Sequence, residues 1–174
     1  MSEAEQGQGH TQIDGLGEPV RSRPQVPEGY GIPPDSEGML SWRWAEERLE
    51  QAKNYWVVTV RPDGRPHAVP VWGAWVDRCF YFDGGGRKAK NLATNPAIVV
   101  HLESGDEVVI VEGVVDRTAV PEPDRFTRIQ DAYAAKYDYR PETASQLFTV
   151  RPRAVLSWHH FPRDATRWRF GDQH

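Results

Sequence analysis

Hydrophobic and polar residues follow two different periods along this chain, and the change of period separates helices from strands. Residues 42–53 carry apolar side chains at helical spacing, and Ser41 is placed to cap the start of that helix. Residues 54–60 and 67–76 are instead rich in β-branched and aromatic residues, which is typical of strands. The Asp-Gly pair within residues 61–66 is a strong hairpin signal, so these two strands are expected to pair.

The same reading extends to the end of the chain. It predicts a strand at 79–83, a short helix ending near Asn95-Pro96, a hairpin of 97–104 with 107–118, a helix at 121–138, and closing strands at 153–161 and 165–170. Mostly antiparallel neighbours and short connections indicate a mainly β fold of the α+β type. We expect a small β-barrel with a few peripheral helices.

The amino-terminal residues 1–38 show almost no apolar periodicity and are rich in Gly, Pro, Gln, Glu and Ser. This composition predicts a disordered or extended tail. The folded domain is therefore expected to cover residues 39–174.

Composition excludes several classes of function. A net charge of −4 argues against a protein that binds nucleic acid through phosphate contacts. The single cysteine, Cys79, cannot form an intramolecular disulfide, and no Cys/His array suggests zinc. Neither a signal peptide nor an apolar run of membrane-spanning length is apparent, so we expect a soluble, cytoplasmic protein with no membrane partner.

The first candidate site is the stretch GGGRKAKNLATNP, residues 84–96, which follows a strand directly. A glycine-rich turn that leads into a helix exposes backbone N–H groups near the positive end of the helix dipole. Arg87 and Lys88 fall in the first turn, where cations are unfavourable unless an anionic ligand is present. Asn91 follows Lys88 by one turn and is expected to face the same side. The alternative is a basic turn exposed to solvent, and the local sequence leaves both interpretations open.

The second candidate is the strand HAVPVWGAWV, residues 67–76. Trp72 with the adjacent Gly73 would suit a flat ring system laid against this strand. The alternative, a core strand with an inward-facing tryptophan, is the commoner case.

The histidines suggest no metal site, and the sequence contains no hydrolase motif. His159 and His160 are neighbours on an expected strand, so they should face opposite sides and not share a metal ion. No motif of a serine hydrolase or a zinc protease occurs, and we expect no metal site.

These segments together resemble the pyridoxamine 5′-phosphate oxidase-like superfamily, the split β-barrel of flavin and deazaflavin enzymes. The resemblance covers about residues 40–170, and its most specific part is RKAKNL, which is similar to the phosphate-gripping segment of that family. Asn91 within it and the closing TRWRF are similar to the flavin/deazaflavin oxidoreductase B group. The substrate-phosphate residues of the true oxidases have no match in the closing segment, so pyridoxamine phosphate is not the expected substrate.

The resemblance implies a homodimer with the cofactor in a groove between two barrels. It implies that Lys88, helped by Arg87 and Asn91, holds the phosphate or acidic tail of the cofactor. Residues lining the cofactor ring would be Val69, Pro70, Val71 and Trp72, with Thr59 nearby.

The function expected from this resemblance is an oxidoreductase that transfers hydride to a small conjugated organic substrate. Coenzyme F-420, a deazaflavin, is the expected cofactor, with FMN second and haem third. No catalytic residue is identified. The alternative is a non-catalytic protein that binds or stores flavin, deazaflavin or haem.

Overall fold

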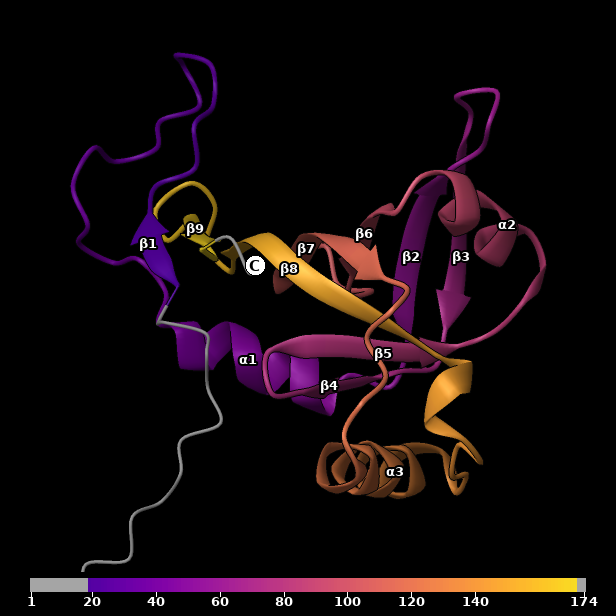
Figure 1. Cartoon of the computed structure of the whole chain (residues 1–174). Helices are drawn as coiled ribbons and strands as arrows, with labels where there is room; N and C mark the ends of the chain where they lie inside the picture. Colours follow the sequence, from indigo (N-terminus) through magenta and orange to yellow (C-terminus); the bar gives the residue numbers. More distant parts are fainter. Residues whose placement is uncertain (1–18, 172–174) are drawn as a thin grey trace, which may run out of the picture.

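The computed structural model describes residues 19–171, which are built around an antiparallel sheet of nine strands (Figure 1). The strands are β1 (Val20–Ser22), β2 (Tyr55–Val60), β3 (Pro66–Val71), β4 (Ala74–Val76), β5 (Cys79–Asp83), β6 (Ala97–His101), β7 (Val108–Asp116), β8 (Leu147–Trp158) and β9 (Thr166–Arg169). The helices are α1 (Trp42–Gln51), α2 (Gly86–Thr94) and α3 (Pro123–Tyr137), with a 3₁₀ turn, η1, at Ala144–Gln146. The mainly β character and the antiparallel pairing are confirmed.

The sheet divides at its longest strand, β8. The main path runs β1-β9-β8-β7-β6-β2-β3, whereas β5 pairs with β8 off this path and carries β4 with it. Residues 154–157 of β8 pair with β9, and residues 147–150 pair with β5, while β7 occupies the other edge of β8 along most of its length. One strand thus exchanges neighbours along its length, and β3 is left as the last strand of the main path.

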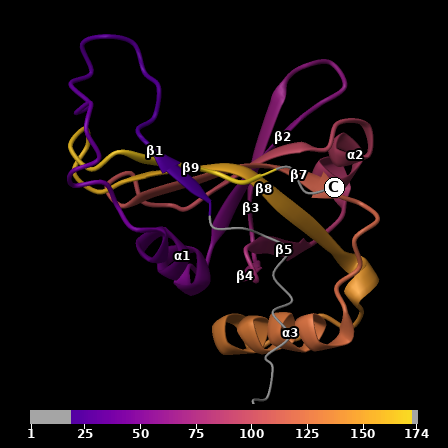
Figure 2. The ribbon, with the colours of Figure 1, turned by 60° about the vertical axis from the view of Figure 1, so that its left-hand side comes forward.

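The core lies between the inner face of this bent sheet and α1. Ser41 caps α1 by accepting from the Trp44 N–H, and Ala45 and Leu49 are fully buried against the sheet. A second cluster forms where α3 contributes Ile129 and Tyr133 below β4 and β5 (Figure 2). Both helices were expected, and their buried residues follow the helical period.

The expected strand 67–76 is divided into β3 and β4 by a break at Trp72 and Gly73. A Cβ atom at Gly73 would lie 2.3 Å from the Phe80 ring and 2.9 Å from the Tyr81 carbonyl oxygen. Glycine is therefore required by packing against β5. The interpretation of Gly73 as space for a flat ligand was wrong.

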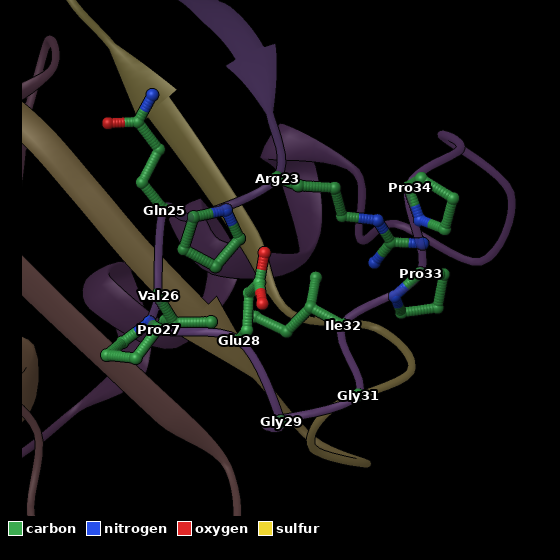
Figure 3. Close-up of a pocket in the computed structure, with 11 residues that line it drawn as sticks. Arg23, Gln25, Val26, Pro27, Glu28, Gly29, Gly31, Ile32, Pro33 and Pro34 are labelled. Carbon is green, nitrogen blue, oxygen red and sulfur yellow. The ribbon is translucent and has the colours of Figure 1, made fainter.

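The amino-terminal segment differs from the expected loose tail within the described residues. Val20–Ser22 pairs with β9, and the next residue, Arg23, donates to four backbone carbonyl oxygens at 2.6–3.0 Å, on Asp35, Glu37, Arg163 and Ala165. The loop that follows lines an open hollow of about 330 Å³ (Figure 3). Sheet pairing with β9 and the half-buried guanidinium group of Arg23 thus attach this segment to the end of the sheet formed by β9.

Among residues 19–171, no helix is both long and apolar enough to cross a membrane.

Candidate functional site

The chain enters α2 along a backbone path that requires glycine at two positions. Gly84 has a φ of +140° and Gly86 a φ of +71°, both in the region that L-residues rarely adopt. Gly85 is the N-cap residue, and no side chain caps the helix. No acidic residue lies in the first turn. The first backbone N–H groups of α2 therefore have neither a capping side chain nor an acidic residue within the first turn.

Lys88 folds back over this turn. Its Nζ lies 3.4 Å from the Gly85 carbonyl oxygen, and a Cβ atom at Gly84 would lie only 2.5 Å from the same Nζ. The glycine at position 84 thus makes room for the ammonium group. A positive charge and uncapped N–H groups gather at one helix end, which is the arrangement that binds phosphate or carboxylate groups. We call Gly84–Lys88 the glycine cradle.

Arg87 adds a second positive charge to the glycine cradle. It is exposed, and within the described part of the chain it forms no hydrogen bond or ion pair. Lys90 is also exposed but lies two positions further along α2, away from the first turn. Arg87 and Lys88 are thus brought together as the sequence predicted.

Asn91 has a different environment from the one expected. It is completely buried, and its Nδ2 donates to the Thr59 hydroxyl oxygen at 2.9 Å, where Thr59 is 1% exposed. The two residues, both predicted to be near the cofactor, therefore bind each other and fix α2 onto β2. The Asn91 Oδ1 is buried and has no hydrogen-bond partner in the described residues. This amide oxygen, one helical turn after Lys88, is thus an unsatisfied acceptor.

The four residues predicted to line a ring do not form one side-chain surface. Val69 and Val71 face the core, whereas Pro70 and Trp72 are exposed. Val69, Pro70 and Val71 belong to β3, the last strand of the sheet path, and Trp72 follows this strand directly. Proline is tolerated at such an edge because its missing N–H interrupts no ladder. Ring contacts at β3 would therefore involve this backbone edge and the exposed Pro70 and Trp72.

Sequence reasoning missed the position of His67. It lies directly opposite Thr59 in the β2–β3 hairpin, and its Nδ1 is buried without a partner in the described residues. Nε of Arg61, at the turn of the same hairpin, is also buried and unpaired. The Asp-Gly signal predicts the hairpin but not this register, because a two-residue turn at Asp63-Gly64 would place Ala68 opposite Thr59, whereas the observed pairing places His67 there.

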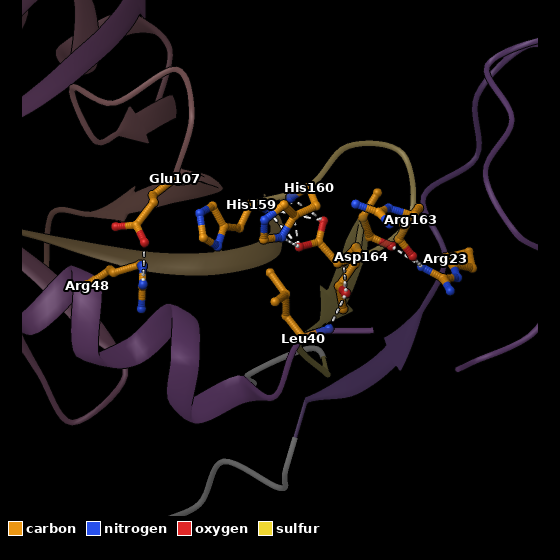
Figure 4. A network of polar contacts seen from close by, with 10 residues as sticks. Arg23, Leu40, Arg48, Glu107, His159, His160, Arg163 and Asp164 are labelled. Carbon is orange, nitrogen blue, oxygen red and sulfur yellow. Dashed lines mark hydrogen bonds and ion pairs between the residues drawn. The ribbon is translucent and has the colours of Figure 1, made fainter. Parts of the chain in front are cut away.

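His159 and His160 also depart from the expectation. Because β8 ends at Trp158, the two histidines lie in a turn, and their rings are 4.0 Å apart rather than on opposite faces. The buried Asp164 carboxylate accepts from both of their backbone N–H groups, which holds the turn (Figure 4). Within residues 19–171 no cluster of three or more His, Cys, Asp or Glu residues could hold a metal ion.

A family model described as pyridoxamine 5′-phosphate oxidase matches residues 43–159, which is more than half of the chain. The chain belongs to the pyridoxamine 5′-phosphate oxidase family. The resemblance seen in the sequence and the split-barrel fold are thereby confirmed, and the family indicates an oxidoreductase-like protein.

The individual proteins that the chain resembles share a third or less of their residues with it. A pyridoxine/pyridoxamine 5′-phosphate oxidase from Rubrobacter xylanophilus is 33% identical over 93 residues, which cover 48% of this chain and 43% of the relative. The match thus spans less than half of that protein. A solved heme-binding protein from Mycobacterium smegmatis has a TM-score of 0.55 at 17% identity, covering 73% of this chain and 58% of the other. An F-420 reductase has a TM-score of 0.48 at 27% identity, covering 75% and 98%.

Proposed function

We propose that this protein is an oxidoreductase that binds coenzyme F-420, or FMN in the same place, and transfers hydride to a small conjugated organic substrate. The observation that carries the proposal is the glycine cradle, a helix start with two cations and no carboxylate or cap of its own. Membership of the family supports it, because Arg87 and Lys88 of the cradle begin the segment RKAKNL, on which the resemblance rests.

The residues present fit such a cofactor. Lys88 and Arg87 neutralise its phosphate or acidic tail, and the N–H groups at the start of α2 donate to the same oxygens. The Asn91–Thr59 bond holds α2 against β2 and so fixes the cradle relative to β3. When bound, the cofactor ring supplies the hydride chemistry, and the protein supplies binding and orientation.

Coenzyme F-420 is preferred over FMN because Asn91 and the closing TRWRF are similar to the deazaflavin group. Storage of a flavin, deazaflavin or haem without turnover is the competing outcome of the tests below.

We also propose that the active form is a homodimer that packs across the outer face of the sheet. One row of cross-strand neighbours runs over this face from β3 to β9: Pro70, Trp56, His101, Ile110, Leu156 and Arg167. Apart from the exposed Pro70, every member of the row is half-buried, and α1 and α2 bury their apolar residues on the inner face. Apolar surface of this kind is commonly covered by a partner.

The cofactor is tested by titrating the protein in parallel with coenzyme F-420, FMN and haem. We expect F-420 to bind with a Kd well below about 100 µM, the level that corresponds to roughly 5.5 kcal/mol. Lys88→Ala should weaken binding about 10-fold or more, because a charge-assisted contact is lost. Lys90→Ala is the matched control and should have no effect, since Lys90 is exposed on the same helix but lies outside the first turn.

Turnover separates an enzyme from a storage protein. Reduced F-420 is mixed with the protein and a panel of quinones and enones, and its oxidation is followed by absorbance. Tight binding without oxidation would favour storage. If no ligand of the three binds, the proposal fails.

The dimer is tested by sedimentation. Ile110→Asp places a carboxylate in the middle of the outer row and should shift the protein from dimer to monomer. A monomeric wild-type protein would overturn this part of the proposal.

A further inference from the structure

Three aromatic side chains form an exposed surface where β3 ends. Trp72 is 51% exposed and stacks on Tyr137 of α3, with ring centroids 4.7 Å apart and an interplanar angle of 9°. Tyr139 is 40% exposed and lies beside Trp72 at 6.5 Å and 49°. We call Trp72, Tyr137 and Tyr139 the aromatic ledge. Since Tyr137 covers one face of the indole, the exposed area belongs mainly to its opposite face.

The ledge is held rigidly by hydrogen bonds. The Tyr137 hydroxyl accepts from the Gly73 N–H at 3.0 Å and lies 2.7 Å from the Lys53 carbonyl oxygen. The Tyr133 hydroxyl donates to the Trp72 carbonyl oxygen at 3.2 Å. A left-handed residue, Asp138, turns the chain after α3 so that Tyr139 returns toward Trp72. A flat surface fixed in this way suits stacking, because little conformational freedom is lost on binding.

The charged residues of the same segment do not provide a phosphate site. Lys136 uses its ammonium group on the Glu50 and Ala52 carbonyl oxygens and the Tyr55 hydroxyl. Arg140 is paired with Asp131 at 2.8 Å. Asp138 is itself an anion. A phosphate ester placed on the ledge would therefore meet no free cation from residues 133–140.

We propose that the aromatic ledge binds the flat, uncharged, conjugated ring of the hydride acceptor. This inference rests on the proposed function and specifies its substrate class: conjugated ring ketones and quinones, not phosphate esters. Trp72 is the residue that follows β3 directly, so a ring stacked on its open face lies next to the strand edge assigned to the cofactor.

The chemical step balances with the cofactor already named. An electrophilic carbon of the acceptor gains hydride, its C=C or C=O π bond breaks, and the resulting anionic oxygen takes one proton from solvent. When bound, a reduced deazaflavin or flavin would supply this hydride, and its two-electron oxidation would balance the reduction of the acceptor.

The test measures ring binding without any cofactor. Equilibrium dialysis gives the affinity for menadione, an uncharged naphthoquinone, and for pyridoxal 5′-phosphate, a charged ring. Trp72→Ala should weaken menadione binding about 10-fold, as expected for the loss of an aromatic stack together with buried area. Trp72→Phe should retain most of the affinity. Binding of pyridoxal 5′-phosphate, whose phosphate has its proposed site in the glycine cradle, should not depend on Trp72.

Matched controls separate the ledge from other aromatic surface and from the cradle. Tyr30→Ala removes an equally exposed aromatic ring, one that lies against Phe161 away from the ledge, and should leave menadione binding unchanged. Lys88→Ala should also leave it unchanged. If Trp72→Ala fails to fold, as judged by its thermal melt, Tyr139→Ala replaces it and should weaken binding in the same direction.

Two results overturn the inference: menadione affinity that is the same in the wild type and the ledge variant, or pyridoxal 5′-phosphate that binds more tightly through Trp72. The proposed function fails separately. F-420 and FMN titrations report on the cradle, so cofactor binding without Trp72-dependent menadione binding would remove the ledge alone.

Discussion

The starts of α1 and α2 are two solutions to the same problem, that of satisfying the first N–H groups of a helix. At α1, Ser41 accepts from the Trp44 N–H, and the first-turn cation Arg43 is paired with Glu47 at 2.9 Å. At α2, Gly85 provides no side-chain cap, and Arg87 and Lys88 have no carboxylate partner among the described residues.

The difference shows which helix start is complete by itself. α1 has its cap and its counter-charge within the chain, so its first turn needs no ligand to complete it. α2 has cations where its dipole favours anions, which is a small destabilisation that an anionic ligand would reverse. The following predictions test this comparison, from the largest expected effect to the smallest.

Gly84→Ala should have the largest effect. An alanine at this position would have to adopt a φ of +140°, and its Cβ would lie 2.5 Å from the Lys88 Nζ, so both the backbone and the lysine must move. We expect a loss of about 2 kcal/mol in the free energy of unfolding, measured by urea denaturation, and weaker cofactor binding. Gly85→Ala is the control, because its φ is ordinary and a Cβ there meets nothing within 4 Å. Equal effects from the two substitutions would contradict the geometry of the cradle.

Gly85→Asp should move stability and ligand binding in opposite directions. The carboxylate supplies the missing cap and favours the helix dipole, so stability should rise by a few tenths of a kcal/mol. The same charge repels an anionic ligand, and we expect affinity to fall about 10-fold. Gly85→Asn caps the helix without the charge, so it should keep most of the affinity. Tighter cofactor binding to the Asp variant would rule out an anion in the cradle.

Ser41→Ala should affect stability alone. Loss of the cap of α1 should cost about 1 kcal/mol, visible as a lower urea midpoint, while cofactor affinity stays as in the wild type. Ser41→Asp should restore the stability. A change in cofactor affinity would mean that α1 is not the self-sufficient helix described above.

At the C-terminal end of α1, Lys136 should make the free energy of unfolding depend slightly on pH. Lys136 of α3 donates to the Glu50 and Ala52 carbonyl oxygens there, and burial lowers its pKa from 10.5 to about 8. Between these two values the unfolded chain binds more protons than the folded one, so stability should rise as pH increases from about 8. Urea denaturation at pH 7.5 and pH 9.5 measures the rise. Both measurements are made in a Cys79→Ala background, because burial raises the pKa of the Cys79 thiol and a free thiol ionises near about pH 8.5, so Cys79 would lower stability in the same window. The window stays below about pH 10, the ordinary range in which tyrosines such as Tyr55 begin to ionise in the unfolded chain.

Lys136→Met should remove this rise, because it removes the titrating group. In the Cys79→Ala background, a stability that falls between the two pH values, or a Lys136→Met variant that keeps the same rise, would contradict the assignment to Lys136.

Much of the fold could be predicted from short-range patterns. The Ser41 cap, the Asp-Gly hairpin and the helical register of Ile129 and Tyr133 all depend on residues close together in the chain. Strand β1 could not be predicted, since Val20–Ser22 acquires its partners only from β9, at the far end of the sequence. The break at Gly73 likewise depends on Phe80 across a turn.

The candidate site divides in the same way. The sequence alone determined that Arg87 and Lys88 follow a glycine turn at a helix start, because spacing within one turn of helix is local. Only the tertiary structure decided that Asn91 binds Thr59, that Val69 and Val71 face inward, and that Trp72 stacks on Tyr137. The Asn91–Thr59 and Trp72–Tyr137 contacts join residues 32 and 65 positions apart. They are set by how α2 and α3 pack on the sheet, which no local period encodes.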